Sequence, residues 1–386
     1  MARWTRWTAL PACALLLGAM SATALAQIKV GITLSSTGGA ASIGSIERNL
    51  ISLWPTTLAG QPVQYIVLDD GSEPSNAVKN ARQFTSDEKV DIIIGSSTSP
   101  NSIAMIPVAE ETSTPMISLA SALAIVSPMD KARRWVFKTV QNDAAMIEAT
   151  LDDMAARKIH RVGYIGLADA TGEGYLAALQ AMGASRGVEL TRIERYNRAD
   201  TSVTAQVLHV LSTSPDAVYV ASLGTPAALP QLELVARGYK GAVYHTGGVA
   251  NNDFLRVAGV AAEGLHLPVA ALLVADQLPE SSPVRAVASA LVAQYESKFG
   301  AGTRNIFLAY TQDSLILLQA ALPAALAKSR PGTREFREAL RDALEKTRGV
   351  VGCSGIFAMS PTDHMGLDAK SLYIAQVNNG RWMLPR

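Results

Sequence analysis

The chain has 386 residues, of which 48% are hydrophobic and 17% are charged, and its formal net charge at pH 7 is +1. This length and apolar content suffice for two hydrophobic cores and exclude a disordered or fibrous chain. Because the lysines and arginines are scattered and balanced by acids, no electric field draws the protein to nucleic acid or anionic lipid, and we expect a small molecule or a specific protein as its partner.

The first 26 residues have the pattern of a cleavable signal peptide. Arg3 and Arg6 give a positively charged start, the apolar run ALPACALLLGAM follows, and ALA at 24–26 places small residues where signal peptidase cleaves. We therefore predict a mature chain that begins at Gln27 and is located in the periplasm. A lipoprotein signal that uses Cys13 is the alternative, although this cysteine precedes most of the apolar run.

The mature chain has one cysteine and no evident membrane span. Removal of the signal peptide leaves only Cys353, so no intramolecular disulfide can form. The longest apolar run, LILLQAALPAALA at 315–327, contains Gln319 and Pro323 and is shorter than a spanning helix requires. We predict a buried, kinked helix there.

From Gln27 onward, short apolar runs typical of strands alternate with longer segments of helical spacing. The first series of predicted strands covers 28–34, 63–69, 90–95 and 115–120. After WVFKTVQND a second series covers 161–167, 189–196, 216–222 and 241–247. The same alternation of strand and helix occurs twice, which predicts two doubly wound α/β lobes with parallel sheets.

The segment from about 281 to 344 is mostly helical in pattern and too small for a lobe of its own, so we place it on the first lobe. The chain then crosses between the lobes near 141, 269 and 355, and a hinge with three crossovers has a restricted motion suited to closing on a ligand. The predicted division of the chain is a signal peptide at 1–26, lobe 1 at 27–141 plus 270–355, and lobe 2 at 142–269 plus 356–386.

The loop LSSTGGAASIG at 34–44 leaves the first predicted strand and opens the first predicted helix. Ligands of open α/β sheets bind outside the carboxyl ends of the strands, and free amides at a helix N-terminus favour an anion. The loop lacks GK[ST] and a G-x-G-x-x-G in register, so it does not match a phosphate site. We expect Ser36 and Thr37 to help hold a carboxylate.

Two further loops repeat this chemistry: GSSTSPNS at 95–102, with Ser97 and Thr98, and SLASA at 118–122. Hydroxyls in any one of these loops have a simpler explanation as helix caps. Three such loops at one edge of a sheet favour a binding site.

These loops, together with WVFKTVQND, SLGTPAALPQLELVARGYKG, GGVANNDFLRVAG and MSPTDHMGLD, closely resemble the branched-chain amino-acid-binding protein family. Members are periplasmic solute-binding components of ABC importers with the type I periplasmic-binding-protein fold, and the chain is most similar to the subgroup associated with aromatic and other organic acids. The resemblance implies a monomeric two-lobed protein that closes on a small molecule, uses no cofactor, and then docks on a membrane permease.

The resemblance also implies site residues. A hydroxyl that holds the ligand carboxylate falls on Ser97 or Thr98, and two further positions fall on Ala120 and on Ala122, where the hydroxyl is lost but Ser121 lies beside it. In the second lobe, Thr171 stands where the family has a tyrosine before glycine. Leu223, or Gly224, stands where a second aromatic residue is common.

The acid that pairs with a ligand ammonium group in amino-acid-binding members is expected where this chain has Gly247. Burying an unpaired ammonium group costs several kcal/mol. Asp143 is the nearest acid by motif, although it equally fits a helix N-cap. We therefore expect an uncharged or carboxylate ligand with an apolar body. An amino-acid-binding component of the same transporter class and a ligand-sensing module of a regulatory system are the alternatives.

No residue set indicates an enzyme or a metal site. Asp363, His364 and Asp368 lie in a segment that reads as an exposed hairpin loop between strands at 355–359 and 371–377, and Ser314 lies in a helical pattern.

Overall fold

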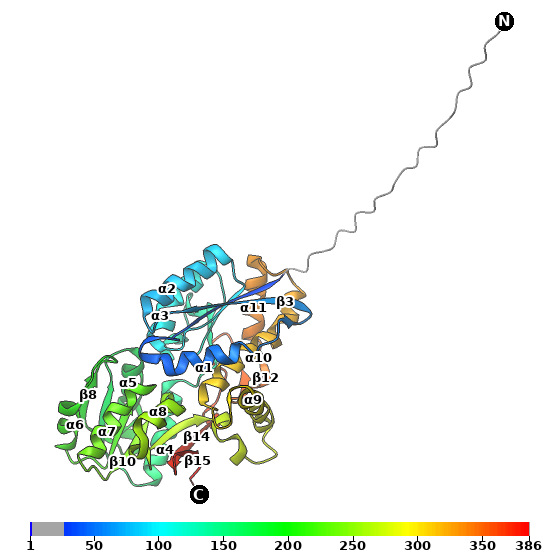
Figure 1. The fold of residues 1–386 in the computed structure, drawn as a ribbon. Helices are drawn as coiled ribbons and strands as arrows, with labels where there is room; N and C mark the ends of the chain where they lie inside the picture. The colour runs from blue at the N-terminus through cyan, green and yellow to red at the C-terminus, as the bar shows by residue number, and fades with distance from the viewer. Residues whose placement is uncertain (2–26, 386) are drawn as a thin grey trace.

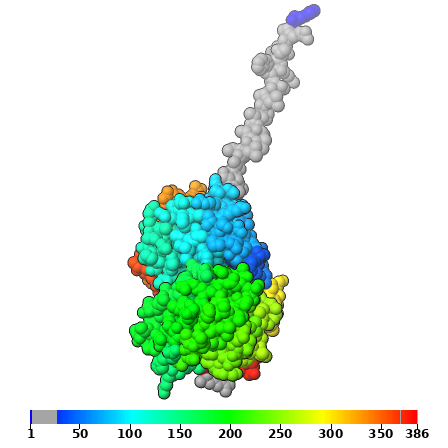
Figure 2. Space-filling view, turned by 90° about the vertical axis from the view of Figure 1, so that its left-hand side faces the viewer, coloured from blue at the N-terminus to red at the C-terminus, as the bar shows by residue number. Residues whose placement is uncertain are grey.

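The computed structural model describes Met1 and residues 27–385, so the predicted signal peptide lies outside the described residues except for Met1. Two α/β lobes lie one above the other (Figure 1), with α2 (Pro74–Gln83), α3 (Ser99–Glu111) and β3 (Gln61–Asp69) in the upper lobe and the helices from α5 (Ala170–Met182) to α8 (Asn252–Ala258) in the lower one. Figure 2 shows a side of the molecule on which the green residues of the lower lobe lie directly against the blue and cyan residues of the upper lobe.

The first sheet has the strand order β2-β3-β1-β4-β5-β6, and all of its pairs are parallel except β2 with β3. Its strands are β1 (Ile28–Leu34), β2 (Thr57–Leu58), β3 (Gln61–Asp69), β4 (Ile92–Gly95), β5 (Met116–Ser118) and β6 (Val136–Lys138). Ile92 and Ile94 pack in one hydrophobic core, and Ile93 between them packs in another on the opposite face. Cover on both faces explains the unbroken apolar strands.

The second sheet has the order β15-β14-β11-β10-β9-β7-β8. Its strands β7 to β11 are parallel, and β14 and β15 add an antiparallel edge. The strands are β7 (Arg161–Leu167), β8 (Glu189–Tyr196), β9 (Ala217–Ala221), β10 (Ala242–His245), β11 (His266–Ala270), β14 (Leu372–Asn378) and β15 (Arg381–Met383). The prediction of two doubly wound lobes is confirmed.

Helices cover both sheets. Those of the first lobe are α1 (Ala41–Ile51), α2 (Pro74–Gln83), α3 (Ser99–Glu111), α10 (Ile306–Leu326) and α11 (Arg334–Glu345). Those of the second are α4 (Asp143–Ala156), α5 (Ala170–Met182), α6 (Thr204–Leu211), α7 (Ala228–Ala236) and α8 (Asn252–Ala258), while α9 (Pro283–Phe299) packs against the 3-10 turns of η9 (Ala271–Gln277). No helix within the described residues has the length and apolar content of a membrane span.

The segment 356–367, which the predicted division assigns to lobe 2, packs with the first sheet. Strand β13 (Ile356–Ala358) pairs with β12 (Arg348–Val351), and Phe357 and Met359 belong to the core of the first sheet. The predicted hairpin over 355–377 is therefore wrong, because its two strands lie in different sheets. We propose to assign 356–367 to lobe 1, which moves the third crossing to about residue 370.

The crossing segments are tied to one another. The side-chain amide of Gln141 donates to the Ser371 hydroxyl at 2.9 Å and to the Ser354 carbonyl oxygen at 3.3 Å. The Thr139 hydroxyl donates to the Tyr310 carbonyl oxygen at 2.9 Å. These contacts place the start of α10 next to the crossing that leads into α4, at the junction of the two lobes.

Candidate functional site

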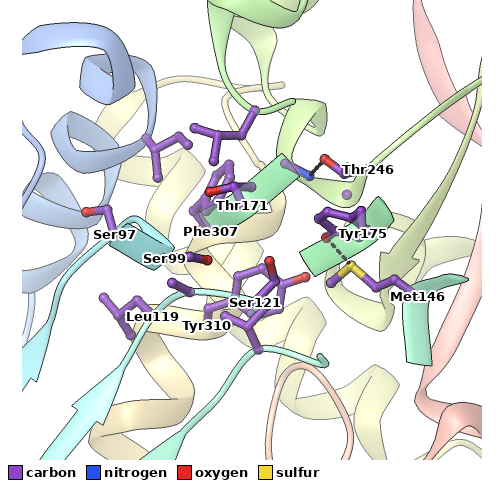
Figure 3. Close-up of a pocket in the computed structure, with 16 residues that line it drawn as sticks. Ser97, Ser99, Leu119, Ser121, Met146, Thr171, Tyr175, Thr246, Phe307 and Tyr310 are labelled. Atoms are coloured by element: carbon purple, nitrogen blue, oxygen red, sulfur yellow. Dashed lines mark hydrogen bonds between the residues drawn. The ribbon is translucent and has the colours of Figure 1, made fainter. Parts of the chain in front are cut away.

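A cavity lies at the junction of the lobes, at the carboxyl ends of strands from both sheets (Figure 3). Its volume is about 30 Å³, which is room for only a few water molecules. Its lining combines hydroxyl groups, aromatic rings and aliphatic side chains, and among the described residues no charged side chain lines it. Such a lining can orient a polar group by hydrogen bonds and bury an apolar body.

The two lobes contact each other near the cavity. A Cβ atom on Gly39 of the first lobe would lie 3.5 Å from Cβ of Arg198 in the second lobe. A Cβ atom on Gly224 of the second lobe would lie 3.0 Å from the Ser42 hydroxyl oxygen of the first. Gly224 and Ser42 are adjacent in sequence to Leu223 and Ile43, which line the cavity, so the two lobes touch beside it.

The N-terminus of α3 supplies polar groups from the first lobe. Ser99, the first residue of this helix, lines the cavity, and Figure 3 shows its hydroxyl directed toward the centre. The Ser99 hydroxyl oxygen accepts a hydrogen bond from the Ala122 amide at 3.2 Å, so its own hydrogen is free to donate. Our sequence analysis missed Ser99, although it belongs to the same GSSTSPNS loop as Ser97 and Thr98.

Ser97 also lines the cavity, but its hydroxyl is already engaged. It accepts from the Ser35 amide at 3.0 Å and forms a hydrogen bond with the carboxyl group of Glu47 on α1. Glu47 is fully buried, and burial raises its pKa to about 8 although the hydrogen bond from Ser97 opposes the shift. The neutral acid is therefore the main form of Glu47 at pH 7.

A buried lysine and a buried acid form hydrogen bonds with the backbone of the segment after β5. Lys138 Nζ donates to the carbonyl oxygens of Ser121 and, at 3.2 Å, of Ala122. Asp143 accepts from the Leu123 amide at 3.1 Å. Asp143 does not line the cavity, and it is not the N-cap of α4, because the Asn142 side chain accepts from the Ala145 amide in that role.

Aromatic rings come from α5 and α10. Tyr175 lies one helical turn after Thr171 on α5, both line the cavity, and the Tyr175 hydroxyl donates to Met146 Sδ at 2.9 Å. Phe307 and Tyr310 reach the cavity from α10, and the buried Tyr310 hydroxyl has no hydrogen-bond partner among the described residues. None of the three rings was predicted from the sequence, since the tyrosine stands four residues after Thr171 and the apolar pattern of α10 does not distinguish a residue that lines a cavity from one in the core.

Gly247 and Gly248 follow β10 and line the cavity on the side of the second lobe. A Cβ atom on Gly247 would lie 2.7 Å from the Pro268 carbonyl oxygen, and one on Gly248 would lie 2.6 Å from Leu223 Cβ. Real Cβ atoms do not come within 3.0 Å of atoms in other parts of the chain to which they are not bonded. Neither position has room for a side chain while the neighbouring backbone stays in place, so this surface of the cavity consists of backbone.

The structure brings part of the predicted site together. The predicted residues that line the cavity are Ser97, Ala120, Ser121, Thr171, Leu223 and Gly247. The predicted residues outside its lining are Ser36, Thr37, Thr98 and Asp143.

Ser36 and Thr37 serve a carboxylate of the protein itself. Their amides donate to Asp69 Oδ1 at 2.9 and 3.2 Å, and the Thr37 hydroxyl donates to Asp69 Oδ2 at 2.6 Å. Burial works to raise the pKa of Asp69, but the hydrogen bonds from Thr37, Gly71 and Ser36 lower it overall. The carboxylate that these two residues hold in the described part of the chain is that of Asp69.

His364, Ser314 and Cys353 are buried away from the cavity and contact other parts of the protein. His364 is buried, its Nδ1 lies 2.8 Å from the Val136 carbonyl oxygen, and its ring stacks on Phe137 at 4.1 Å. The Ser314 hydroxyl donates to the Thr311 carbonyl oxygen within α10, and burial raises the pKa of the Cys353 thiol. In residues 27–385 no group of three or more His, Cys, Asp or Glu is placed to hold a metal ion.

Comparisons with known proteins agree with this geometry. A family model described as periplasmic binding protein matches residues 27–381. An extracellular ligand-binding receptor from Rhodopseudomonas palustris HaA2 has 42% sequence identity over 93% of this chain and 100% of its own, with a TM-score of 0.90. No sequence among the curated proteins matches significantly.

More distant structures share the fold. The leucine-binding protein LivK from Thermotoga maritima is 23% identical, with a TM-score of 0.80 over 93% of this chain and 98% of its own. A solute-binding protein of an ABC transporter from R. palustris, solved in complex with benzoate, is 20% identical, with a TM-score of 0.80 over 93% of this chain and 95% of its own.

Proposed function

The chain belongs to the periplasmic binding protein family, and from this premise we propose that it captures a small organic carboxylate with an apolar body, such as an aromatic acid, and delivers it to an ABC permease in the membrane. Proteins of this family are ligand-binding proteins rather than enzymes. The predicted signal peptide supports a location in the periplasm, where such a receptor meets both its ligand and the permease.

The observation that carries the ligand class is the uncharged lining of the cavity. An α-amino acid brings an ammonium group whose burial costs several kcal/mol unless an acid pairs with it. Among the described residues no acid lines the cavity, and the backbone at Gly247 leaves no room for one. A carboxylate needs hydrogen-bond donors, and Ser99, Ser121 and Tyr310 present hydroxyl groups there.

The aromatic and aliphatic lining supports an apolar ligand body. Phe307, Tyr175 and Tyr310 present ring surface, and Leu119 and Leu223 complete an apolar wall. Aromatic rings prefer offset-stacked or edge-to-face neighbours, which a flat aromatic acid can provide. The benzoate complex of the R. palustris relative shows that the fold accepts such a ligand, and we extend that to this chain as a proposal.

Calorimetry on the mature protein, starting at Gln27, tests the ligand class with benzoate, benzamide and leucine as probes. We expect benzoate to bind with roughly micromolar affinity, about −8 kcal/mol. Leucine should bind at least about a hundredfold more weakly, because its ammonium group is buried without a partner. Tight binding of leucine would overturn the proposed ligand class and would point to Asp143, behind the cavity, as the acid that pairs with the ammonium group.

Transport and sensing are separated by a second experiment. If the protein serves a permease, cells that lack it should take up a labelled form of the bound acid more slowly at micromolar concentrations. Unchanged uptake together with a lost transcriptional response would favour a sensing role.

A further inference from the structure

Lys138, on β6, is a fully buried lysine that lies one layer behind the cavity. It is not part of the lining, but its Nζ donates to the carbonyl oxygens of Ser121 and Ala122. Ser121 lines the cavity, and Figure 3 shows it beside Ser99 and Tyr310. The position of Ser121 in the cavity wall thus depends on Lys138, which is not itself exposed to the cavity.

The contact with Lys138 fixes the orientation of one peptide group. In a trans peptide the carbonyl oxygen and the following amide hydrogen point in opposite directions. Because the Ser121 carbonyl oxygen faces Lys138, the Ala122 amide points to the other side, where it donates to the Ser99 hydroxyl oxygen at 3.2 Å. The Ser99 hydroxyl, with an acceptor position filled, keeps its hydrogen for a group in the cavity.

Titratable groups lie around Lys138. Asp143 at the start of α4 and Asp363 in the segment before β14 act on Lys138. The Lys138 backbone amide donates to the His364 carbonyl oxygen, and Tyr175 on α5 interacts with Asp143. Burial lowers the pKa of Lys138 to about 7, while Asp143 and Asp363 oppose the shift. Burial also raises the pKa of Asp143, against the effect of Lys138. Loss of the proton from Lys138 would therefore leave acidic groups uncompensated behind the cavity.

We propose that Lys138 is a positioning residue for ligand binding: it orients the Ser121–Ala122 peptide so that Ser99 donates its hydroxyl hydrogen to the ligand carboxylate. This inference rests on the proposed function, because it needs a ligand that accepts hydrogen bonds. A benzoate-like anion gains most from it, and a neutral amide, which can turn its own NH₂ group toward an acceptor, gains least.

A double-mutant cycle in ligand affinity tests the relay. Lys138→Met and Ser99→Ala should each weaken benzoate binding about tenfold or more, and the double variant should bind no worse than about the weaker single variant, because both changes remove the same donor. Thr98→Ala is the matched control: Thr98 is adjacent to Ser99 but outside the cavity lining, so combining it with Lys138→Met should leave the loss caused by Lys138→Met unchanged.

A pH series needs no change at Lys138 and keeps the inference testable if that variant folds poorly. Benzoate affinity of the unmodified protein should fall as the pH rises from about 6 to about 9, benzamide affinity should change less than about twofold, and Ser99→Ala should lose most of the benzoate dependence. A flat benzoate profile, or equal dependence with and without Ser99, overturns the relay.

Failure of the relay and failure of the ligand class give different results. If leucine binds and benzoate does not, the proposed ligand class is wrong, and the cycle is repeated with leucine, whose carboxylate is the same acceptor. If benzoate binds tightly but the effects of Lys138→Met and Ser99→Ala simply add, the ligand class stands and the relay is wrong.

Discussion

The backbone at Gly247 lies so close to the Pro268 carbonyl oxygen that a Cβ atom on residue 247 would sit 2.7 Å from it. This relationship fixes the chemistry of the site on the side of the second lobe. An acid at this position would require movement of β11, which follows in the same sheet. The absence of a charge partner is thus enforced by packing and does not depend on one side chain alone.

Gly247→Ala should destabilise the protein by about 1 to 3 kcal/mol, because the added methyl group forces the backbone apart. Urea unfolding of the ligand-free protein measures the change. Gly39→Ala is the control, since a Cβ atom there would make an ordinary contact of 3.5 Å with Arg198. Equal stability of the two variants would show that the backbone near Pro268 yields easily.

Ser121→Ala should weaken the binding of a carboxylate by about 1.5 to 3 kcal/mol, the usual worth of a hydrogen bond to a charged group. Thr98→Ala should leave the affinity within about twofold, because Thr98 lies outside the cavity lining. Calorimetry with benzoate compares the two. An effect of Thr98 as large as that of Ser121 would mean that the cavity rearranges when the ligand binds.

Tyr310→Phe should lower carboxylate affinity without lowering stability, because the Tyr310 hydroxyl is buried in the cavity wall and has no partner within residues 27–385. Tyr219→Phe is a matched control, since the Tyr219 hydroxyl is also buried and has no partner in the described part of the chain, but does not line the cavity. Melting curves and benzoate titrations of both variants are the measurement, and a loss of affinity in Tyr219→Phe alone would contradict the assignment.

Glu47 should make stability depend on pH. Its pKa is raised by burial from 4.5 to about 8, so the folded state holds a proton that the unfolded state has lost. The contribution of this proton to the free energy of unfolding is complete below pH 4.5. It is lost as the pH rises toward 8, by up to about 1.4 kcal/mol per pH unit.

The difference in unfolding free energy between the unmodified protein and Glu47→Gln isolates this effect from other titrating groups. The difference should shift in favour of the glutamine variant as the pH rises from about 5 to about 8. A constant difference would show that Glu47 titrates alike in both states.

The N-terminus of the exported protein should be Gln27, or its cyclised form, if the ALA motif at 24–26 is the cleavage site. Mass spectrometry of the protein from the periplasm measures it. A diacylglyceryl group on Cys13 would support the lipoprotein alternative instead.

The sequence by itself determined the architecture. Parallel strands that are covered on both faces must be apolar throughout. A run such as Ile92–Ile94 can therefore be recognised as a strand from its own sequence, without knowing which segments pack against it. Helical spacing between such runs, repeated in two series, leaves two doubly wound lobes as the solution. The missing acid at Gly247 was also visible in the sequence.

Only the tertiary structure decided which polar groups face the cavity. Ser97 and Ser99 stand two residues apart in one loop, yet the first bonds to Glu47 while the second turns toward the cavity, and this depends on where α3 begins. Ser36 and Thr37 looked like a free anion site because Asp69, which occupies them, lies on another strand. Periodicity reports which face of an element is buried, whereas a site formed by distant segments depends on how the elements pack, and that information is not local in the chain.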